Sequence, residues 1–134
     1  MFRTALLSIP LFVLFVATAH ACRCRPPAPP LEALKKSKAA FVGKVTAVKV
    51  DGRQKVVSVA VSQSWKGDVA KEITVHTAGS SAACGYGFQV GKEYLIYCSG
   101  KSGDVWTTNL CTRTRPLGKA KEDLEALGPG MMPK

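Results

Sequence analysis

The residues best suited to chemistry lie near the start of the chain, where Cys22 and Cys24 stand two positions apart. They follow Met1–Ala21, a segment with a basic start, a long apolar run and the small-x-small ending Ala19-His20-Ala21. These features are typical of a secretory signal peptide. Cleavage after Ala21 would leave Cys22 as the first residue, with a free α-amino group. We therefore predict a secreted, extracellular protein, or a periplasmic or cell-surface protein if the source is bacterial.

Two other interpretations of this leader are weaker. The apolar run Ala5–Ala17 is shorter than the ~20 residues that a membrane-spanning helix needs, and no other stretch approaches that length, so we predict no membrane span. A lipoprotein leader would instead anchor the chain by a lipid on Cys22. Such leaders usually carry a leucine three residues before the cysteine and a small residue two before it, where Ala19 and His20 stand here.

A free α-amino group at Cys22 could bind a metal ion. The pKa of such a group is about 8, so part of it is neutral at physiological pH. Its nitrogen and the carbonyl oxygen of the same residue can form a five-membered chelate. The catalytic zinc of a protease keeps one position open for water, and a rigidly held amino terminus could take that position. Rigidity matters because ordering a flexible terminus on binding would cost several kcal/mol.

Five cysteines follow the predicted cleavage site: Cys22, Cys24, Cys84, Cys98 and Cys111. In an exported domain of this size they indicate a disulfide framework with one cysteine left over. No C-x-x-C pair is present and the only mature histidine, His76, has no nearby partner, so a structural zinc site is not expected. The chain also lacks a nucleophile–base constellation and the βαβ pattern of thiol oxidoreductases. We predict no enzymatic activity and no cofactor of its own.

The elements that must hold this terminus are mostly strands. The proline-rich segment 26–30 is stiff and extended, and a short helix with Leu31 and Leu34 on one face follows it. Alternating apolar residues predict strands, joined by glycine turns, at Phe41–Val50, Val57–Trp65, Ile73–Thr77, Tyr94–Cys98 and Val105–Thr108. A second short helix is predicted over about 119–127, with a frayed tail over 128–134. Short antiparallel strands favour a small closed β-barrel, since closure removes exposed edges.

The charge of the chain suggests acidic partners. Cleavage after Ala21 leaves residues 22–134 as a single domain, and Arg3 departs with the leader, so 18 basic and 9 acidic side chains remain, a net charge of +9. This charge favours polyanionic glycans, anionic surfaces or an acidic protein face. The basic residues are scattered, and an exported chain is not expected to bind nucleic acid. Solubility alone also explains such a charge.

The sequence resembles the N-terminal, netrin-like domain of the tissue inhibitors of metalloproteinases over almost all of residues 22–134. The leading C-x-C directly after a signal peptide, the later C-G and the order of the motifs carry the resemblance. The matching segments are Cys22–Pro26, Phe41–Val45, Trp65–Gly67, Cys84–Tyr86, Gly91–Tyr97 and Trp106–Cys111.

The resemblance implies a five-stranded barrel of the oligonucleotide/oligosaccharide-binding (OB) type and disulfides from Cys22 to Cys84 and from Cys24 to Cys111. On the chain-entropy model each such bridge would stabilise the fold by about 4 kcal/mol. It also implies that Cys22 chelates the zinc of a partner metalloprotease. An inhibitory ridge would then comprise Cys22, Arg23, Cys24, Arg25 and Pro26, together with Ser81, Ala82 and Ala83.

The sequence departs from the family at several positions. It lacks counterparts of the family's second, cysteine-rich domain and third disulfide, and Cys98 is predicted to be a buried, inert thiol. Arg23 stands where the family presents a small or hydroxylated residue to the protease's specificity pocket. Either the target differs, or the chain is a non-inhibitory, netrin-like adhesion module whose basic surface binds polyanionic glycans or a protein.

Overall fold

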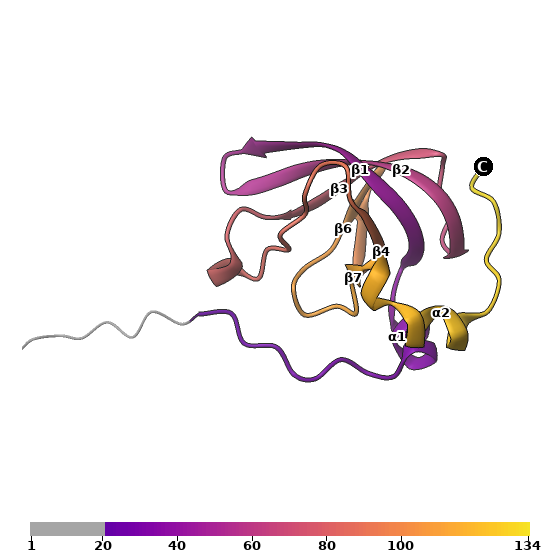
Figure 1. The fold of residues 1–134 in the computed structure, drawn as a ribbon. Coiled ribbons are helices and arrows are strands. Elements are labelled where there is room, and N and C mark those ends of the chain that lie inside the picture. Colours follow the sequence, from indigo (N-terminus) through magenta and orange to yellow (C-terminus); the bar gives the residue numbers. More distant parts are fainter. Residues whose placement is uncertain (1–20) are drawn as a thin grey trace, which may run out of the picture.

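The computed structural model describes residues 21–134. In these residues, segments in which apolar and polar residues alternate form one mixed β-sheet (Figure 1). The predicted signal peptide, apart from Ala21, lies outside the described residues. The described residues form seven strands, two short α-helices and two short 3₁₀ helices (η). In chain order they are α1 (Pro30–Lys36), β1 (Ala39–Asp51), β2 (Gln54–Lys66), β3 (Glu72–Ala78), η1 (Ser81–Ala83), β4 (Glu93–Cys98), β5 (Gly100–Ser102), β6 (Val105–Thr107), β7 (Arg115–Pro116), η2 (Leu117–Lys119) and α2 (Lys121–Leu127). The predicted mainly β fold with short flanking helices is confirmed.

The predicted closure of a five-stranded barrel is not confirmed. In residues 21–134 the sheet has seven strands in the order β5-β6-β3-β2-β1-β4-β7, and its end strands β5 and β7 do not pair. The outer edge of β4 shows why the sheet does not close. β7 covers it only at Tyr94 and Leu95, and at Tyr97 threonine hydroxyls replace a neighbouring strand. Thr114 Oγ1 accepts a hydrogen bond from Tyr97 N at 3.0 Å, and Thr108 Oγ1 donates to Tyr97 O at 2.7 Å.

Two apolar layers lie on opposite faces of the sheet, because successive side chains of a strand point to opposite faces. Phe41, Val45 and Ile96 face the inner core, which also holds Trp106. Leu95 and Tyr97 face outward and pack with residues of both helices. Register shifts between β1 and β2 bend β1.

The two helices cover the outer layer beside each other (Figure 1). Ala33 and Leu34 of α1, together with Leu124 and Leu127 of α2, pack against it. Ala120, directly before α2, is fully buried in the same layer. Ala120, Leu124 and Leu127 thus form an apolar stripe that packs on the sheet. In residues 21–134 no helix is long and apolar enough to cross a bilayer.

The predicted frayed tail over 128–134 instead lies along β2. Met131 and Ser64 exchange backbone hydrogen bonds of 2.7 and 2.8 Å, and Lys134 O accepts a bond from Lys71 N at 3.1 Å. Trp65 Nε1 donates to Gly128 O at 2.9 Å. The physical reason is a free strand edge: β3 pairs with β2 only between Gln54 and Ala60, so the end of β2 has backbone groups that the tail satisfies.

Candidate functional site

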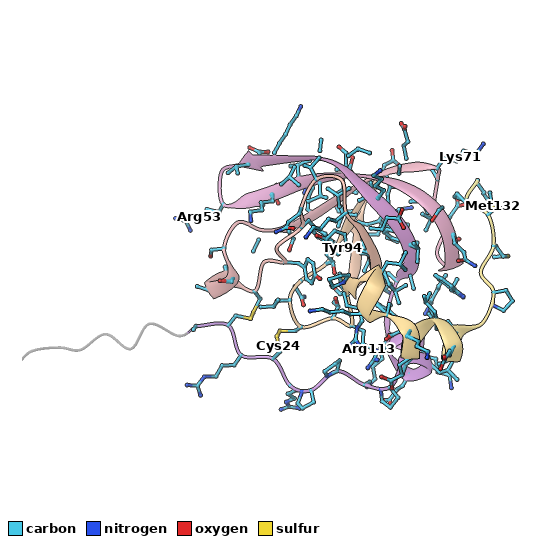
Figure 2. All side chains as sticks on the ribbon, viewed as in Figure 1. Cys24, Arg53, Lys71, Tyr94, Arg113 and Met132 are labelled. Carbon is cyan, nitrogen blue, oxygen red and sulfur yellow. A yellow bond between two sulfur atoms is a disulfide. The ribbon has the colours of Figure 1, made fainter. Side chains whose placement is uncertain are left out.

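Two disulfides fasten the N-terminal strip, Cys22–Pro29, to the sheet domain. Cys22 is bonded to Cys84, 62 positions later, and Cys24 to Cys111, 87 positions later. These are the pairings that the resemblance implied. Figure 2 shows the strip running below the sheet, with the bridge at Cys24 next to it. The bridges pack on each other, since Cys22 Sγ lies 3.8 Å from Cys111 Sγ. The two disulfides therefore form one cluster, which we call the disulfide cluster.

The strip presents most of the predicted ridge residues to solvent. Arg23, Cys24, Arg25 and Pro26 are exposed, and Cys22 is half-buried. The strip belongs to no strand and no helix. It enters α1 at Pro30, which is buried and suits the first turn of a helix. The strip is thus a stiff, exposed segment that begins at the disulfide cluster and ends in the helix.

The second part of the predicted ridge is a short turn that leads into Cys84. Ser81, Ala82 and Ala83 form η1 and are exposed. The Ser80 side chain caps this turn by accepting a bond from Ala83 N at 3.3 Å. Through its bridge to Cys84, Cys22 is held next to η1. The structure therefore brings both predicted parts of the ridge together.

The backbone around Cys84 is tightly constrained. Cys84 adopts a left-handed conformation with φ of 65°, which is uncommon outside glycine. At the next position, a Cβ on Gly85 would fall on the carbonyl oxygen of Ala78. Gly85 therefore allows the backbone to pack closely against Ala78, directly after Cys84. This close packing fixes the position of Cys84 and so of the bridge that holds Cys22.

The loop Thr108–Thr114, which we call the platform loop, carries the other anchor, Cys111. Besides the bonds to Tyr97, Thr112 Oγ1 donates to Thr114 Oγ1 at 2.7 Å. Asn109 Oδ1 accepts from Cys111 N at 2.8 Å. Leu110 N donates to Cys84 O at 2.8 Å, so the platform loop also touches the residue that holds Cys22. The hydroxyl and amide groups of this loop therefore determine the position of Cys111.

Sequence reasoning did not identify two residues of this region. Leu110 is 42% exposed beside the disulfide cluster. Arg113, labelled in Figure 2, is buried next to the strip and contacts it at Ala28. The only signal for Leu110 was its place inside the motif Trp106–Cys111. For Arg113 the sequence carried no signal, because an arginine near a run of threonines looks like any surface cation.

A buried carboxylate neutralises Arg113. Asp123, which is 0% exposed, accepts bonds from Arg113 Nε and, at 2.9 Å, from Arg113 Nη2. It also accepts a bond from Tyr97 Oη at 2.9 Å, and Arg115 Nη1 lies 3.5 Å from its Oδ2. Burial by itself raises the pKa of Asp123, but the hydrogen bonds from Arg113 and Tyr97 and the attraction of both arginines outweigh it, so the pKa is lowered. Asp123 is therefore a charged acceptor inside the fold.

The sulfur cluster is not a ready metal site. The sulfur atoms of Cys22, Cys84 and Cys111 lie within 4.8 Å of one another, but each is part of a disulfide. Metal binding by cysteine needs a thiolate. The metal-binding groups that remain at Cys22 are its carbonyl oxygen and the α-amino nitrogen that the predicted cleavage after Ala21 would free.

A large hollow lies away from the strip. A groove of about 650 Å³ lies over β1, β2, β3 and the β5–β6 hairpin, and its lining includes Ser58, Asp68, Lys101 and Trp106. A smaller hollow of about 280 Å³ lies against the strip, between Pro26 and the platform loop. Arg25 and Pro26 of the predicted ridge are exposed and line one side of this smaller hollow.

Cys98 is the fifth cysteine, free and fully buried at the end of β4. Burial raises the pKa of its thiol to about 12, so at pH 7.5 almost no thiolate forms. We expect iodoacetamide to leave the native protein unmodified and to label one thiol after denaturation, as measured by intact mass. Labelling of the native protein as fast as of the denatured protein would contradict this assignment.

No protein-family model matches the chain, and no curated protein matches it significantly.

Proposed function

We propose that the chain is a secreted inhibitor of zinc metalloproteases that blocks the catalytic zinc with the α-amino nitrogen and carbonyl oxygen of Cys22. The observation that carries this proposal is the fixation of Cys22 and Cys24 by bridges to Cys84 and Cys111. A chelating terminus must be rigid, because each mobile side chain that becomes ordered on binding costs about 0.5–1.5 kcal/mol. The resemblance to the tissue inhibitors of metalloproteinases points to the same function.

The ridge would then act as a wedge. Its members are Cys22, Arg23, Cys24, Arg25 and Pro26 of the strip, with Ser81, Ala82 and Ala83 of η1. An exposed, disulfide-anchored ridge suits the concave active-site cleft of a protease. Two disulfides in the described part of the chain are also what an oxidising, extracellular environment allows.

The strand order of the sheet supports a fold of the OB type. OB-type barrels are themselves partly open, and β6, β3, β2, β1 and β4 are consecutive neighbours in the sheet. We assign these five strands to an OB-like barrel. Its remaining gap, between β6 and β4, is bridged by Thr108, directly after β6, which donates to Tyr97 O of β4.

Inhibition assays with purified proteases test the proposal. The exported protein, whose intact mass shows a start at Cys22, two disulfides and one thiol, is titrated against a panel of zinc endopeptidases that degrade extracellular matrix. We expect stoichiometric inhibition of at least one member and no effect on a serine protease. Equal activity of every zinc enzyme with and without the protein would refute the proposal.

Arg23 is expected to select the target. It is exposed between two bridged cysteines, where the ridge would enter the specificity pocket beside the zinc, so the preferred protease should carry an acidic group there. We expect Arg23→Glu to weaken inhibition by roughly tenfold or more, equivalent to about 1.4 kcal/mol. Arg25→Glu, which makes the same charge change two residues later, is the control. Equal losses for both variants would show only a general charge effect.

The basic surface supports a second candidate, a binding module for polyanionic glycans. Lys35, Lys38, Lys44, Lys49 and Lys92 are exposed. We expect the protein to bind heparin, with retention that falls as salt rises, because salt screens exposed charges. Heparin retention together with inactivity against the zinc proteases would favour this function. Salt-insensitive retention would argue against an electrostatic surface.

A further inference from the structure

The middle of the N-terminal strip cannot be held as a β-strand. Pro26, Pro27, Pro29 and Pro30 have no backbone N–H group, so a ladder of hydrogen bonds cannot form along this stretch. What the strip does offer is carbonyl oxygens. A hydrogen-bond donor from the rest of the domain can therefore anchor the strip between the bridge at Cys24 and the start of α1 through these carbonyl oxygens.

Arg113 of the platform loop is such a donor. Its Nη1 donates to the carbonyl oxygen of Ala28 at 3.2 Å. Among residues 21–134 this is the only hydrogen bond recorded from the rest of the domain to a backbone group between Cys24 and Ala28. A guanidinium carries five N–H donors in a rigid planar fork, so one side chain can bind the strip and an internal acceptor at once.

The other side of the fork is fixed inside the fold. Arg113 is 7% exposed, and its Nε and Nη2 bind the fully buried carboxylate of Asp123. Asp123 is held in turn by the hydroxyl of Tyr97, whose backbone is bonded to Thr108 and Thr114. The contact at Ala28 thus continues through rigid, buried groups to the core strand β4.

We propose that Arg113 is a positioning residue of the inhibitory ridge, acting as a third anchor of the N-terminal strip after the two disulfides. It binds the strip four residues beyond Cys24, so Arg25 and Pro26 of the ridge lie between two fixed points. Cys111 and Arg113 both belong to the platform loop, so one loop holds both points. This inference rests on the proposed function for its effect on inhibition, but the anchoring itself does not.

Two matched variants test the anchor. Arg113→Lys keeps the charge next to Asp123 but loses the fork that spans Asp123 and Ala28. Arg115→Lys makes the same chemical change at the other arginine beside Asp123, whose recorded contacts are with Asp123 and with the carbonyl oxygen of Arg113. Backbone ¹⁵N order parameters of Arg25 and Ala28 are measured for the wild type and both variants, each free in solution. Inhibition constants of the same three proteins are measured against a zinc protease that the wild type inhibits.

In Arg113→Lys we expect the order parameter of Ala28 to fall from about 0.85 towards about 0.6, and in Arg115→Lys to stay at its wild-type value. Inhibition should weaken by roughly fivefold in Arg113→Lys and by less than about twofold in Arg115→Lys, because a mobile strip must be ordered on binding. An Ala28 amide as rigid in Arg113→Lys as in the wild type would overturn the anchor. A mobile strip with unchanged inhibition would overturn its role in the ridge.

The wild-type protein provides a test that does not depend on the folding of a variant. Anchored at both sides, the guanidinium of Arg113 should show slow rotation about its Nε–Cζ bond by NMR, with separate Nη signals, whereas exposed Arg23 should show one averaged signal. An averaged Arg113 signal would also overturn the anchor. If the wild type inhibits no zinc protease, the proposed function fails, while the order parameters and the Arg113 signals still decide whether the strip is anchored.

Discussion

Adding one alanine before Cys22 is expected to abolish inhibition, with a loss of at least about a hundredfold, equivalent to about 2.7 kcal/mol. The extension turns the α-amino nitrogen of Cys22 into an amide, which has no lone pair available for zinc. It also places an additional residue where the zinc would bind. The measurement compares inhibition constants of the extended and authentic proteins against the same zinc protease.

The extended protein must first be shown to be folded. Its intact mass should show both disulfides, and its melting temperature should match that of the authentic protein, since the added residue lies outside the bridged cluster. Acetylation of the authentic N-terminus is a matched control, because it removes the amine without adding a residue. Undiminished inhibition by either protein would rule out chelation by the amino terminus.

Replacing Asp123 by alanine is expected to lower the free energy of unfolding by about 3–5 kcal/mol, because it leaves a buried cation without its partner. Arg113, 7% exposed, would lose its bidentate carboxylate, and Tyr97 would lose the acceptor of its hydroxyl. The measurement is urea unfolding at pH 7. Glu122→Ala is the control: this neighbouring carboxylate touches Arg113 Nη2 at 3.3 Å, but its side chain is 73% exposed, so its loss should change stability by less than about 1 kcal/mol.

The advantage of the wild type over Asp123→Ala should depend on pH. The pKa of Asp123 is lower in the folded protein than in the unfolded chain, so its contribution is fully present above the unfolded value of about 4. It is lost as pH falls from there through the lowered folded value. The two unfolding free energies should therefore converge in acid. An Asp123→Ala protein as stable as the wild type at pH 7 would show that the buried pair contributes nothing.

The parts of the fold that could be predicted are those set by local patterns. Alternation at Phe41, Val45, Val57 and Val59 identified β1 and β2, and the helix predicted over about 119–127 corresponds to α2. The order of motifs, through the family resemblance, gave both disulfide pairings. Such features depend on residues close together in sequence, or on a framework shared with known proteins.

The parts that were missed depend on contacts between distant residues. Threonine hydroxyls at Thr108 and Thr114 occupy the edge of β4 at Tyr97, and no local pattern indicates that they replace a strand. The tail lies along β2 because the pairing of β2 with β3 stops at Ala60, short of Ser64, a matter of strand length and register. Arg113 and Asp123 stand ten positions apart, so neither helical nor strand spacing predicts that they meet in the interior.

The most direct test of the central claim observes the metal itself. A zinc metalloprotease that the protein inhibits is prepared with Co²⁺ in place of its zinc, and its visible absorption spectrum is recorded before and after addition of the authentic protein. We predict a change in the cobalt bands, because an amino nitrogen and a carbonyl oxygen replace the bound water. The alanine-extended protein should leave the bands unaltered. An unaltered spectrum in a fully inhibited complex of the authentic protein would contradict chelation by Cys22.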